Sequence, residues 1–212
     1  EYESFPLTEI QHAYLVSRGD SSSQATVGTT YCQIFAVDEI DLDRLDAAWG
    51  KVQKRHGMMR ASVEEDGTQS IAPSSKIGHI ERAECANSSE AKQQLEEIKR
   101  TVFALAKPPL HRVVSISWHE ESGKQTRLVF CFDYTVLDAL SVMTVLAELA
   151  ELYENPGADL PGIGLTFRDF VVGHRRDGRE VEEAEGYWRS RLPELPPAPQ
   201  LPLAADPSTV GE

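Results

Sequence analysis

The chain has 212 residues, of which 41% are hydrophobic, enough for one large or two small globular domains. Its 34 acidic and 21 basic residues give a net charge of −13, which repels a phosphate backbone and argues against nucleic acid as a partner. No apolar run approaches the roughly 20 residues of a membrane span, and the N-terminus lacks the pattern of a signal peptide, so we expect a cytoplasmic protein with no membrane partner.

The first 72 residues predict a helix at 8–19, a strand at 30–37, a helix at 42–55 and a hairpin at 59–72. Thr8 followed three residues later by Gln11 has the spacing of a capping box, in which the two residues satisfy the first backbone N–H groups of a helix. Asp66-Gly67 is typical of the turn in a two-stranded hairpin. These elements predict a mixture of helix and sheet.

The rest of the chain predicts a helix at 88–106, strands at 111–119 and 126–134, a helix at 139–155, and a last helix that carries Tyr187 and Trp188. A polar turn separates the two strands, which favours an antiparallel pair. Alternation in the second strand places its apolar residues on two faces, and we expect Asp133 to leave the core at the strand's end. The expected apolar stripe of the helix after it comprises Leu140, Met143, Leu146, Leu149 and Tyr153.

The cysteines and histidines predict no metal site. Cys32, Cys85 and Cys131 are odd in number and form no CxxC pair, so we expect three reduced thiols packed as small apolar side chains. The six histidines show no spacing typical of metal ligands.

The stretch DYTVLDALS holds the candidate site residues Asp133, Asp138 and Ser141, at a junction between a strand and a helix. Such a junction can present polar side chains to a cleft while both elements hold them in place. A structural interpretation competes with catalysis, because Asp138 is also well placed to cap the helix that follows. The residues alone leave these alternatives open.

Four segments together resemble a heterocyclization (Cy) domain of nonribosomal peptide synthetases. D-x-x-x-x-D-x-x-S at positions 133–141 is similar to the signature of that family. FPLTEIQHAYLVSR is similar to its opening motif, with Ser17 where glycine is usual. RHGMMRASV with the following DGTQ resembles a second motif, and LPELPPAPQLPL after Tyr187-Trp188-Arg189 resembles a fourth. The resemblance covers essentially the whole chain.

The resemblance implies a fold and a chemistry. The fold is one α/β (α+β) sandwich lobe of the chloramphenicol-acetyltransferase type, the N-terminal half of a V-shaped condensation-type domain. Amide-forming relatives carry H-H-x-x-x-D-G, whose histidines fall on Asp133 and Tyr134 here, so both are absent. The implied reaction joins an upstream acyl thioester to carrier-bound Cys, Ser or Thr and then removes water to give a thiazoline or oxazoline.

The resemblance also implies roles for individual residues. The Asp and Thr most directly tied to ring formation belong to the C-terminal lobe of the family, so Asp133, Asp138 and Ser141 are expected to be mostly architectural. By analogy with the superfamily, Arg60 should form a salt bridge with Asp138. Arg175 and Arg176 are a minority candidate for contact with phosphopantetheine or an acidic carrier domain.

We expect residues 1–192 to form the N-terminal lobe and residues 193–212 a proline-rich crossover or linker. The expected partners are upstream and downstream carrier domains and the C-terminal lobe, with self-association through the face that this lobe would cover. No cofactor is expected to bind directly, since carrier proteins present the phosphopantetheine. The chain is expected to be an excised or deliberately made half, inactive alone.

Three hypotheses stay open at this point. The chain is half of a cyclase, a lobe that binds carrier proteins without chemistry, or a degenerate amide-forming domain, which the missing histidines disfavour.

Overall fold

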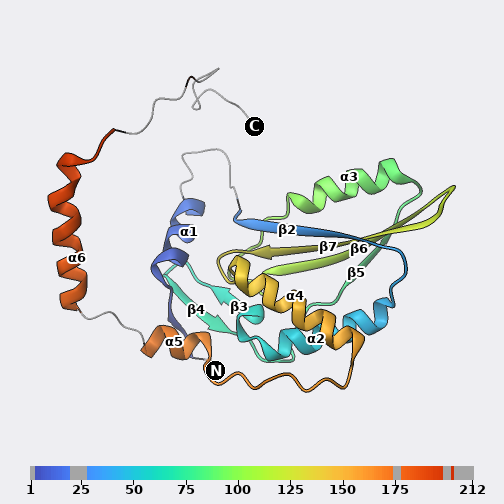
Figure 1. The fold of residues 1–212 in the computed structure, drawn as a ribbon, viewed down its shortest axis with the longest axis horizontal. Helices are drawn as coiled ribbons and strands as arrows, with labels where there is room; N and C mark the ends of the chain where they lie inside the picture. Colours follow the sequence, from blue (N-terminus) through green and yellow to red (C-terminus); the bar gives the residue numbers. More distant parts are fainter. Residues whose placement is uncertain (1–2, 20–27, 174–177, 198–201, 203–212) are drawn as a thin grey trace.

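The computed structural model describes residues 3–19, 28–173, 178–197 and 202, which form two sheets flanked by helices (Figure 1). The strand order of the smaller sheet is β1 (Phe5–Pro6), β4 (Thr68–Ile71), β3 (Ala61–Val63), and that of the larger sheet is β2 (Thr30–Val37), β7 (Gly123–Asp133), β6 (His111–Glu120), β5 (Glu81–Glu84). The main helices are α1 (Glu9–Gly19), α2 (Leu42–Arg55), α3 (Ser88–Lys99), α4 (Ala139–Glu154), α5 (Phe167–Gly173) and α6 (Gly178–Arg191). Short 3-10 helices, η1 (Gly57–Arg60) and η2 (Leu192–Glu194), complete the list.

The larger sheet has helices on both faces, with α2 and α4 on one side and α3 on the other (Figure 1). Strand β7 contributes side chains to the cores on both faces of the sheet, because its side chains alternate between the two faces. Leu128, Phe130 and Phe132 pack in the core with α2 and α4, whereas Val129 and Cys131 pack beneath α3. The predicted antiparallel pairing of β6 and β7 and the predicted α/β fold class are confirmed.

The predicted start of α1 is also confirmed. The Thr8 backbone N–H donates to Gln11 Oε1 at 3.0 Å, and the Gln11 N–H donates to Thr8 Oγ1 at 3.4 Å. The hairpin turns at Asp66-Gly67 as predicted, and Gly67 has φ +81°, a conformation that residues with a Cβ rarely adopt. Both local patterns therefore predicted correctly where the helix begins and where the hairpin turns.

The helix predicted at 88–106 is too long, since α3 ends at Lys99. Residues beyond this point make backbone contacts with other elements. The Phe103 carbonyl accepts from Arg18 Nη1 at 3.1 Å, and the Leu105 carbonyl accepts from the Val63 N–H at 2.9 Å. These tertiary hydrogen bonds replace the helical ones, an outcome that local sequence does not encode. The short strands β1 and β5 were not predicted either, and β5 runs parallel to β6.

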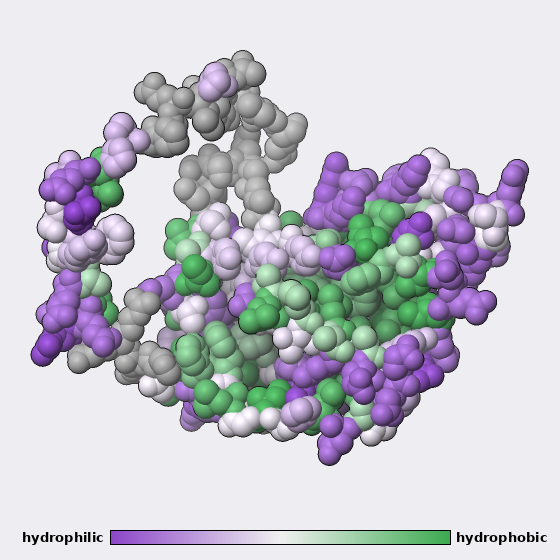
Figure 2. Space-filling model, viewed as in Figure 1, coloured by the Kyte–Doolittle hydropathy of each residue, from purple (hydrophilic) through white to green (hydrophobic). Residues whose placement is uncertain are grey.

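The predicted apolar stripe of α4 is partly wrong. Leu140 and Met143 are exposed, at 71% and 67% of their full surface, while Val142 and Val145 are buried. The N-terminal half of α4 therefore turns apolar side chains both to the core and outward. Figure 2 shows apolar side chains gathered over the middle of one face of the molecule.

The expectation of three reduced thiols is wrong for this structure. Cys32 of β2 and Cys131 of β7 lie directly opposite each other in the antiparallel pair, with their Cα atoms 4.2 Å apart, and form a disulfide. Facing positions on adjacent antiparallel strands bring side chains close together, and the pairing of these strands is a long-range property. Cys85 is a buried free thiol as expected.

Helix α6 carries Tyr187 and Trp188, both more than half exposed. The proline-rich segment after it lies mostly outside the described residues. No helix in the described ranges has the length and apolar character needed to cross a membrane.

Candidate functional site

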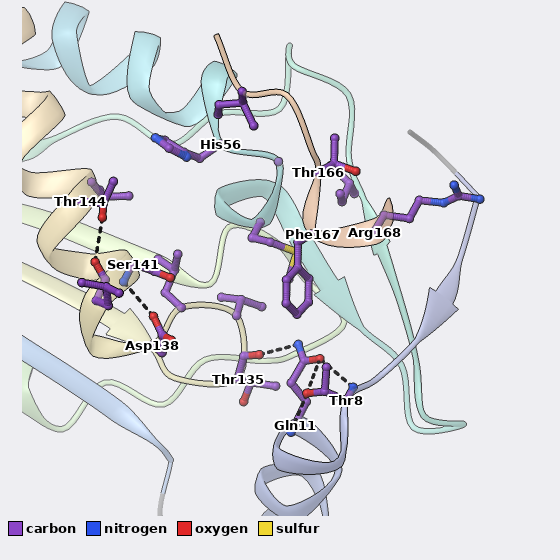
Figure 3. A pocket seen from close by; sticks show the side chains of 18 of the residues that line it. Thr8, Gln11, His56, Thr135, Asp138, Ser141, Thr144, Thr166, Phe167 and Arg168 are labelled. Atoms are coloured by element: carbon purple, nitrogen blue, oxygen red, sulfur yellow. Dashed lines mark hydrogen bonds between the residues drawn. The ribbon is translucent and has the colours of Figure 1, made fainter. Parts of the chain in front are cut away.

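A cleft of about 800 Å³ opens between the loop that joins β7 to α4, the start of α1, the end of α2 with η1, and the segment that leads into α5 (Figure 3). Polar residues on its border include Thr8, Gln11, His56, Thr135, Asp138, Ser141, Thr144, Thr166 and Arg168. Apolar residues such as Met58, Leu140 and Phe167 border it as well. The cleft therefore brings together segments that are far apart in the sequence, from Thr8 to Asp169.

Asp133 does not face this cleft and does not leave the core, contrary to expectation. Its side chain is fully buried and pairs with Arg18 at the end of α1. Its Oδ1 also accepts from Thr29 Oγ1 at 3.1 Å and from the Thr135 N–H at 2.9 Å. A buried charge needs a partner and hydrogen bonds, and Asp133 has both. It therefore anchors the loop from below the cleft.

Asp138 and Ser141 border the cleft together, at the first turn of α4 (Figure 3). Asp138 is the N-cap of α4, and its Oδ1 accepts from the Ser141 N–H at 2.8 Å. A hydrogen bond from the Ser141 side chain, followed by that from its backbone, lowers the pKa of Asp138 below its usual value. Asp138 is therefore ionised at neutral pH and satisfied as a cap, which agrees with the structural interpretation.

The expected salt bridge between Arg60 and Asp138 is not formed. Arg60 is buried, and its guanidinium donates to backbone carbonyls. Three of these carbonyls lie at the end of α2, those of Gln53, Lys54 at 2.9 Å and His56 at 3.5 Å. The fourth is the carbonyl of Ala72, directly after β4, at 3.0 Å. Unpaired carbonyls at a helix C-terminus attract a cation. Arg60 thus fixes α2 and η1, whereas Asp138 is engaged by α4.

A buried amide pair supports the cleft from the side of α1, and the sequence did not identify it as part of the site. Gln11 Nε2 donates to Gln69 Oε1 at 2.9 Å. It also donates to the Thr135 carbonyl at 2.8 Å (Figure 3). Gln69 Nε2 in turn donates to the Pro6 carbonyl at 3.0 Å. These bonds join the opening segment, the hairpin and the β7–α4 loop. The sequence signals were the capping-box spacing that places Gln11 at the start of α1 and the position of both glutamines within segments that resemble family motifs.

His56 and Arg55 border the cleft and share one carboxylate. His56 Nε2 lies 2.6 Å from Glu148 Oε2, and Arg55 Nε lies 3.0 Å from the same atom. This cluster ties the end of α2 to α4. Arg175 and Arg176, the candidates for contact with a carrier, lie outside the described residues. Within the described ranges, no group of three or more His, Cys, Asp or Glu is arranged to hold a metal ion.

The chemistry available at this cleft is limited by these contacts. Asp133 is neutralised by Arg18, and Asp138 is a helix cap with a lowered pKa, so neither carboxylate is arranged as a proton donor. Tyr134 and Thr135, which lie between these two carboxylates in the sequence, also border the cleft. Binding and positioning of a ligand are the functions that the described residues support.

Comparison with known proteins gives one family. The sequence model of the condensation-domain family matches residues 2–211 of this chain. Over 216 residues the chain is 30% identical to bacitracin synthase 1 of Bacillus licheniformis, covering 100% of this chain and 4% of that protein. It is 31% identical to phenyloxazoline synthase MbtB of Mycolicibacterium paratuberculosis, covering 97% of this chain and 18% of that protein.

Among solved structures, the cyclization-docking bidomain of the EpoB nonribosomal peptide synthetase from Sorangium cellulosum is similar to the whole chain. The TM-score is 0.87 at 31% identity, and the match covers 43% of that chain. The present chain therefore spans less than half of the proteins to which it is similar.

Proposed function

The chain belongs to the condensation-domain family, and from this membership we propose that it is the N-terminal half of a heterocyclization domain in a nonribosomal peptide synthetase. Residues 1–192 would form the lobe, and residues 193–212 would lead toward a C-terminal lobe. The observation that carries the proposal is the loop from Asp133 to Ser141, which joins β7 to α4 beside the cleft and has no histidine. Similarity to a cyclization bidomain and to a phenyloxazoline synthase supports it.

The proposed reaction has two stages. The amine of a carrier-bound Cys, Ser or Thr attacks the upstream acyl thioester, which forms an amide and releases the upstream thiol. The side-chain thiol or hydroxyl then adds to the amide carbonyl, and loss of water gives the ring. The phosphopantetheine arms of two carrier domains would bring both substrates to the cleft.

The described residues would hold the cleft in shape during both stages. Arg18 neutralises Asp133, and Asp138 caps α4, so the two motif carboxylates fix the loop rather than transfer protons. Dehydration needs a proton donor for the departing oxygen, and we propose that the C-terminal lobe supplies it. The lobe described here would be inactive alone.

Intact-protein mass spectrometry of carrier-bound products tests this proposal. The chain is supplied alone, and then with its C-terminal half, to a donor carrier and a Cys-, Ser- or Thr-loaded acceptor carrier. We expect a product lighter than the open amide by one water only when both halves are present. As a control, Asp43→Asn, at an exposed carboxylate on α2, should leave ring formation by the two halves unchanged.

Two other products would point to other functions. An open amide from both halves together would mean an amide-forming domain, and the proposal would fail. Carrier binding with neither amide nor ring would mean a docking lobe without chemistry.

A further inference from the structure

Among the described strands, the larger sheet has two edge strands, and these two edges differ. Strand β5 forms one edge with the four residues ERAE, of which three are charged. Strand β2 forms the other edge with the eight residues TYCQIFAV, which include neither a charge nor a proline (Figure 1). Short length, charged side chains and proline are the means by which proteins keep edge strands from pairing with other chains. Strand β5 is protected in this way, whereas β2 is not.

The register of β2 on β7 determines which backbone groups of β2 point away from the sheet. The Tyr134 N–H donates to the Thr29 carbonyl at 2.9 Å, and the antiparallel register continues from there without a break. In an antiparallel pair, every second residue exchanges hydrogen bonds with the neighbouring strand. The backbone groups of Cys32, Ile34 and Ala36 therefore point outward, and their N–H groups have no hydrogen bond within the described ranges.

The side chains of β2 are incompletely covered on both faces of the sheet. Tyr31 packs against the core with α2 and α4, and Ile34 packs against the core beneath α3, but both stay partly exposed. Phe35 and Ala36 are exposed, Phe35 to 39% of its full surface. Neighbouring strands place their side chains on the same two faces of a sheet. A further strand beside β2 would therefore cover these side chains and extend both cores.

We propose that β2 is an interface between two copies of this chain, in which β2 of one copy pairs antiparallel with β2 of the other. The strand is complementary to itself, since a two-fold axis at Ile34 sets Ile34 against the partner's Ile34 and Cys32 against the partner's Ala36. These are residues whose backbone groups point outward, so the two copies can exchange hydrogen bonds. Such a contact uses the same surface on both copies, which is the arrangement of two-fold dimers.

Charge and position favour a second copy at this edge. Addition of a strand to a sheet edge depends on main-chain hydrogen bonds to an extended segment, and β2 itself is such a segment. The net charge of −13 on each copy opposes association, but physiological salt screens it beyond about 8 Å, and residues 30–37 carry no charge. None of residues 30–37 borders the cleft, so this inference is independent of the proposed function.

Analytical ultracentrifugation and amide hydrogen exchange of this chain, over a range of concentrations at physiological ionic strength, test the inference. We expect an equilibrium between monomer and dimer. The amides of Cys32, Ile34 and Ala36 should exchange more slowly as the concentration rises, because the second copy then bonds to them. The amides of Tyr31 and Gln33 are the internal control, since they bond to β7 in the monomer and should exchange at the same rate throughout.

Two variants act on the edge itself. Ile34→Pro removes the outward N–H from each copy and keeps the bonds to β7, and loss of these two hydrogen bonds should raise the dimer dissociation constant about tenfold or more. Ala36→Lys adds a charge at an exposed position of the edge and should also weaken the dimer. Leu140→Lys makes the same change of charge at an exposed apolar residue beside the cleft, and as the matched control it should leave the dimer unchanged.

Three results would overturn the inference. The first is a chain that stays monomeric at every concentration measured. The second is a dimer that Leu140→Lys disperses and Ala36→Lys does not, which would place the contact at the cleft. The third is slower exchange of the outward amides only after a C-terminal half is added, which would assign the edge to that half. If Ile34→Pro does not fold, Ala36→Lys and the exchange rates decide the matter.

Discussion

Arg18 of α1 and Asp133 of β7 form an ion pair inside the molecule, with side-chain exposures of 9% and 0%. The two residues are 115 positions apart in the sequence and belong to two segments that were identified separately by their resemblance to family motifs. Their contact joins these two segments in the folded protein. It holds the end of the central strand, and with it the loop at the cleft, against the first helix.

Removing one partner of this pair should destabilise the protein strongly. Arg18→Leu leaves the Asp133 carboxylate buried without its cation, and we expect the free energy of unfolding to fall by about 3–5 kcal/mol. Urea denaturation followed by circular dichroism measures this change. The double variant Arg18→Leu with Asp133→Asn should lose less than the sum of the two single variants; additive losses would mean that the pair is not coupled.

Asp138 should behave as a helix cap. Asp138→Ala removes the acceptor for the Ser141 N–H and should lower the free energy of unfolding by about 1 kcal/mol. Asparagine is also a good N-cap, so Asp138→Asn should stay within a few tenths of a kcal/mol of the wild type. Equal destabilisation by alanine and asparagine would show that the charge, rather than the cap, matters at this position.

His111 should make stability depend on pH. Burial lowers the pKa of His111 to about 4, against a weaker opposing effect of its hydrogen bond to the Met59 backbone, and its ring packs edge-on against Trp49. In the unfolded chain the imidazole takes up a proton near pH 6.5. The folded protein therefore holds His111 neutral at no cost above pH 6.5. As the pH falls from 6.5 toward 4, the unfolded chain gains a proton that the folded protein does not, and the free energy of unfolding falls by up to about 3 kcal/mol.

Unfolding free energies of the wild type and His111→Phe, measured at steps between pH 7 and pH 4, isolate this effect. The variant should lack the part of the pH slope that His111 causes. His119→Gln, at an exposed position, is the control and should keep the wild-type slope. Parallel curves for wild type and His111→Phe would contradict the prediction.

The pair Cys32–Cys131 should be detectable by thiol counting. Alkylation after unfolding without reductant should label one cysteine, Cys85, and alkylation after reduction should label three. Because the disulfide closes a long loop, its reduction should lower the free energy of unfolding by about 2–4 kcal/mol. Cys32→Ala should show the lower stability with or without reductant, and three labelled cysteines in the unreduced chain would refute the pairing.

Local patterns predicted the elements whose signals are complete within a few residues. Thr8 and Gln11 satisfy each other across one helical turn, and the hairpin turn depends on the adjacent residues Asp66 and Gly67. The end of α3 was predicted wrongly because residues after Lys99 bond to Arg18 and Val63, which are distant in the sequence. Short-range signals thus succeeded where the hydrogen bonds were themselves short-range.

The candidate site divides in the same way. The N-cap of Asp138 depends on a hydrogen bond from Ser141, only three residues away, and the sequence allowed this role as an alternative to catalysis. The partners of Asp133 and Arg60 depend on tertiary packing, so Arg18 was missed and the bridge from Arg60 to Asp138 was predicted wrongly. A buried side chain is satisfied by whichever neighbour the fold supplies.

The order of strands in the larger sheet bears on how this chain is made. Among the strands that the structure describes, β2 pairs only with β7, and the facing residues Cys32 and Cys131 are 99 positions apart. At a ribosomal rate of about 5–20 residues per second, roughly 5–20 seconds pass between the synthesis of the two strands. Throughout this interval the nascent β2 has no hydrogen-bonding partner in the sheet, so translation sets the earliest moment at which the sheet can close.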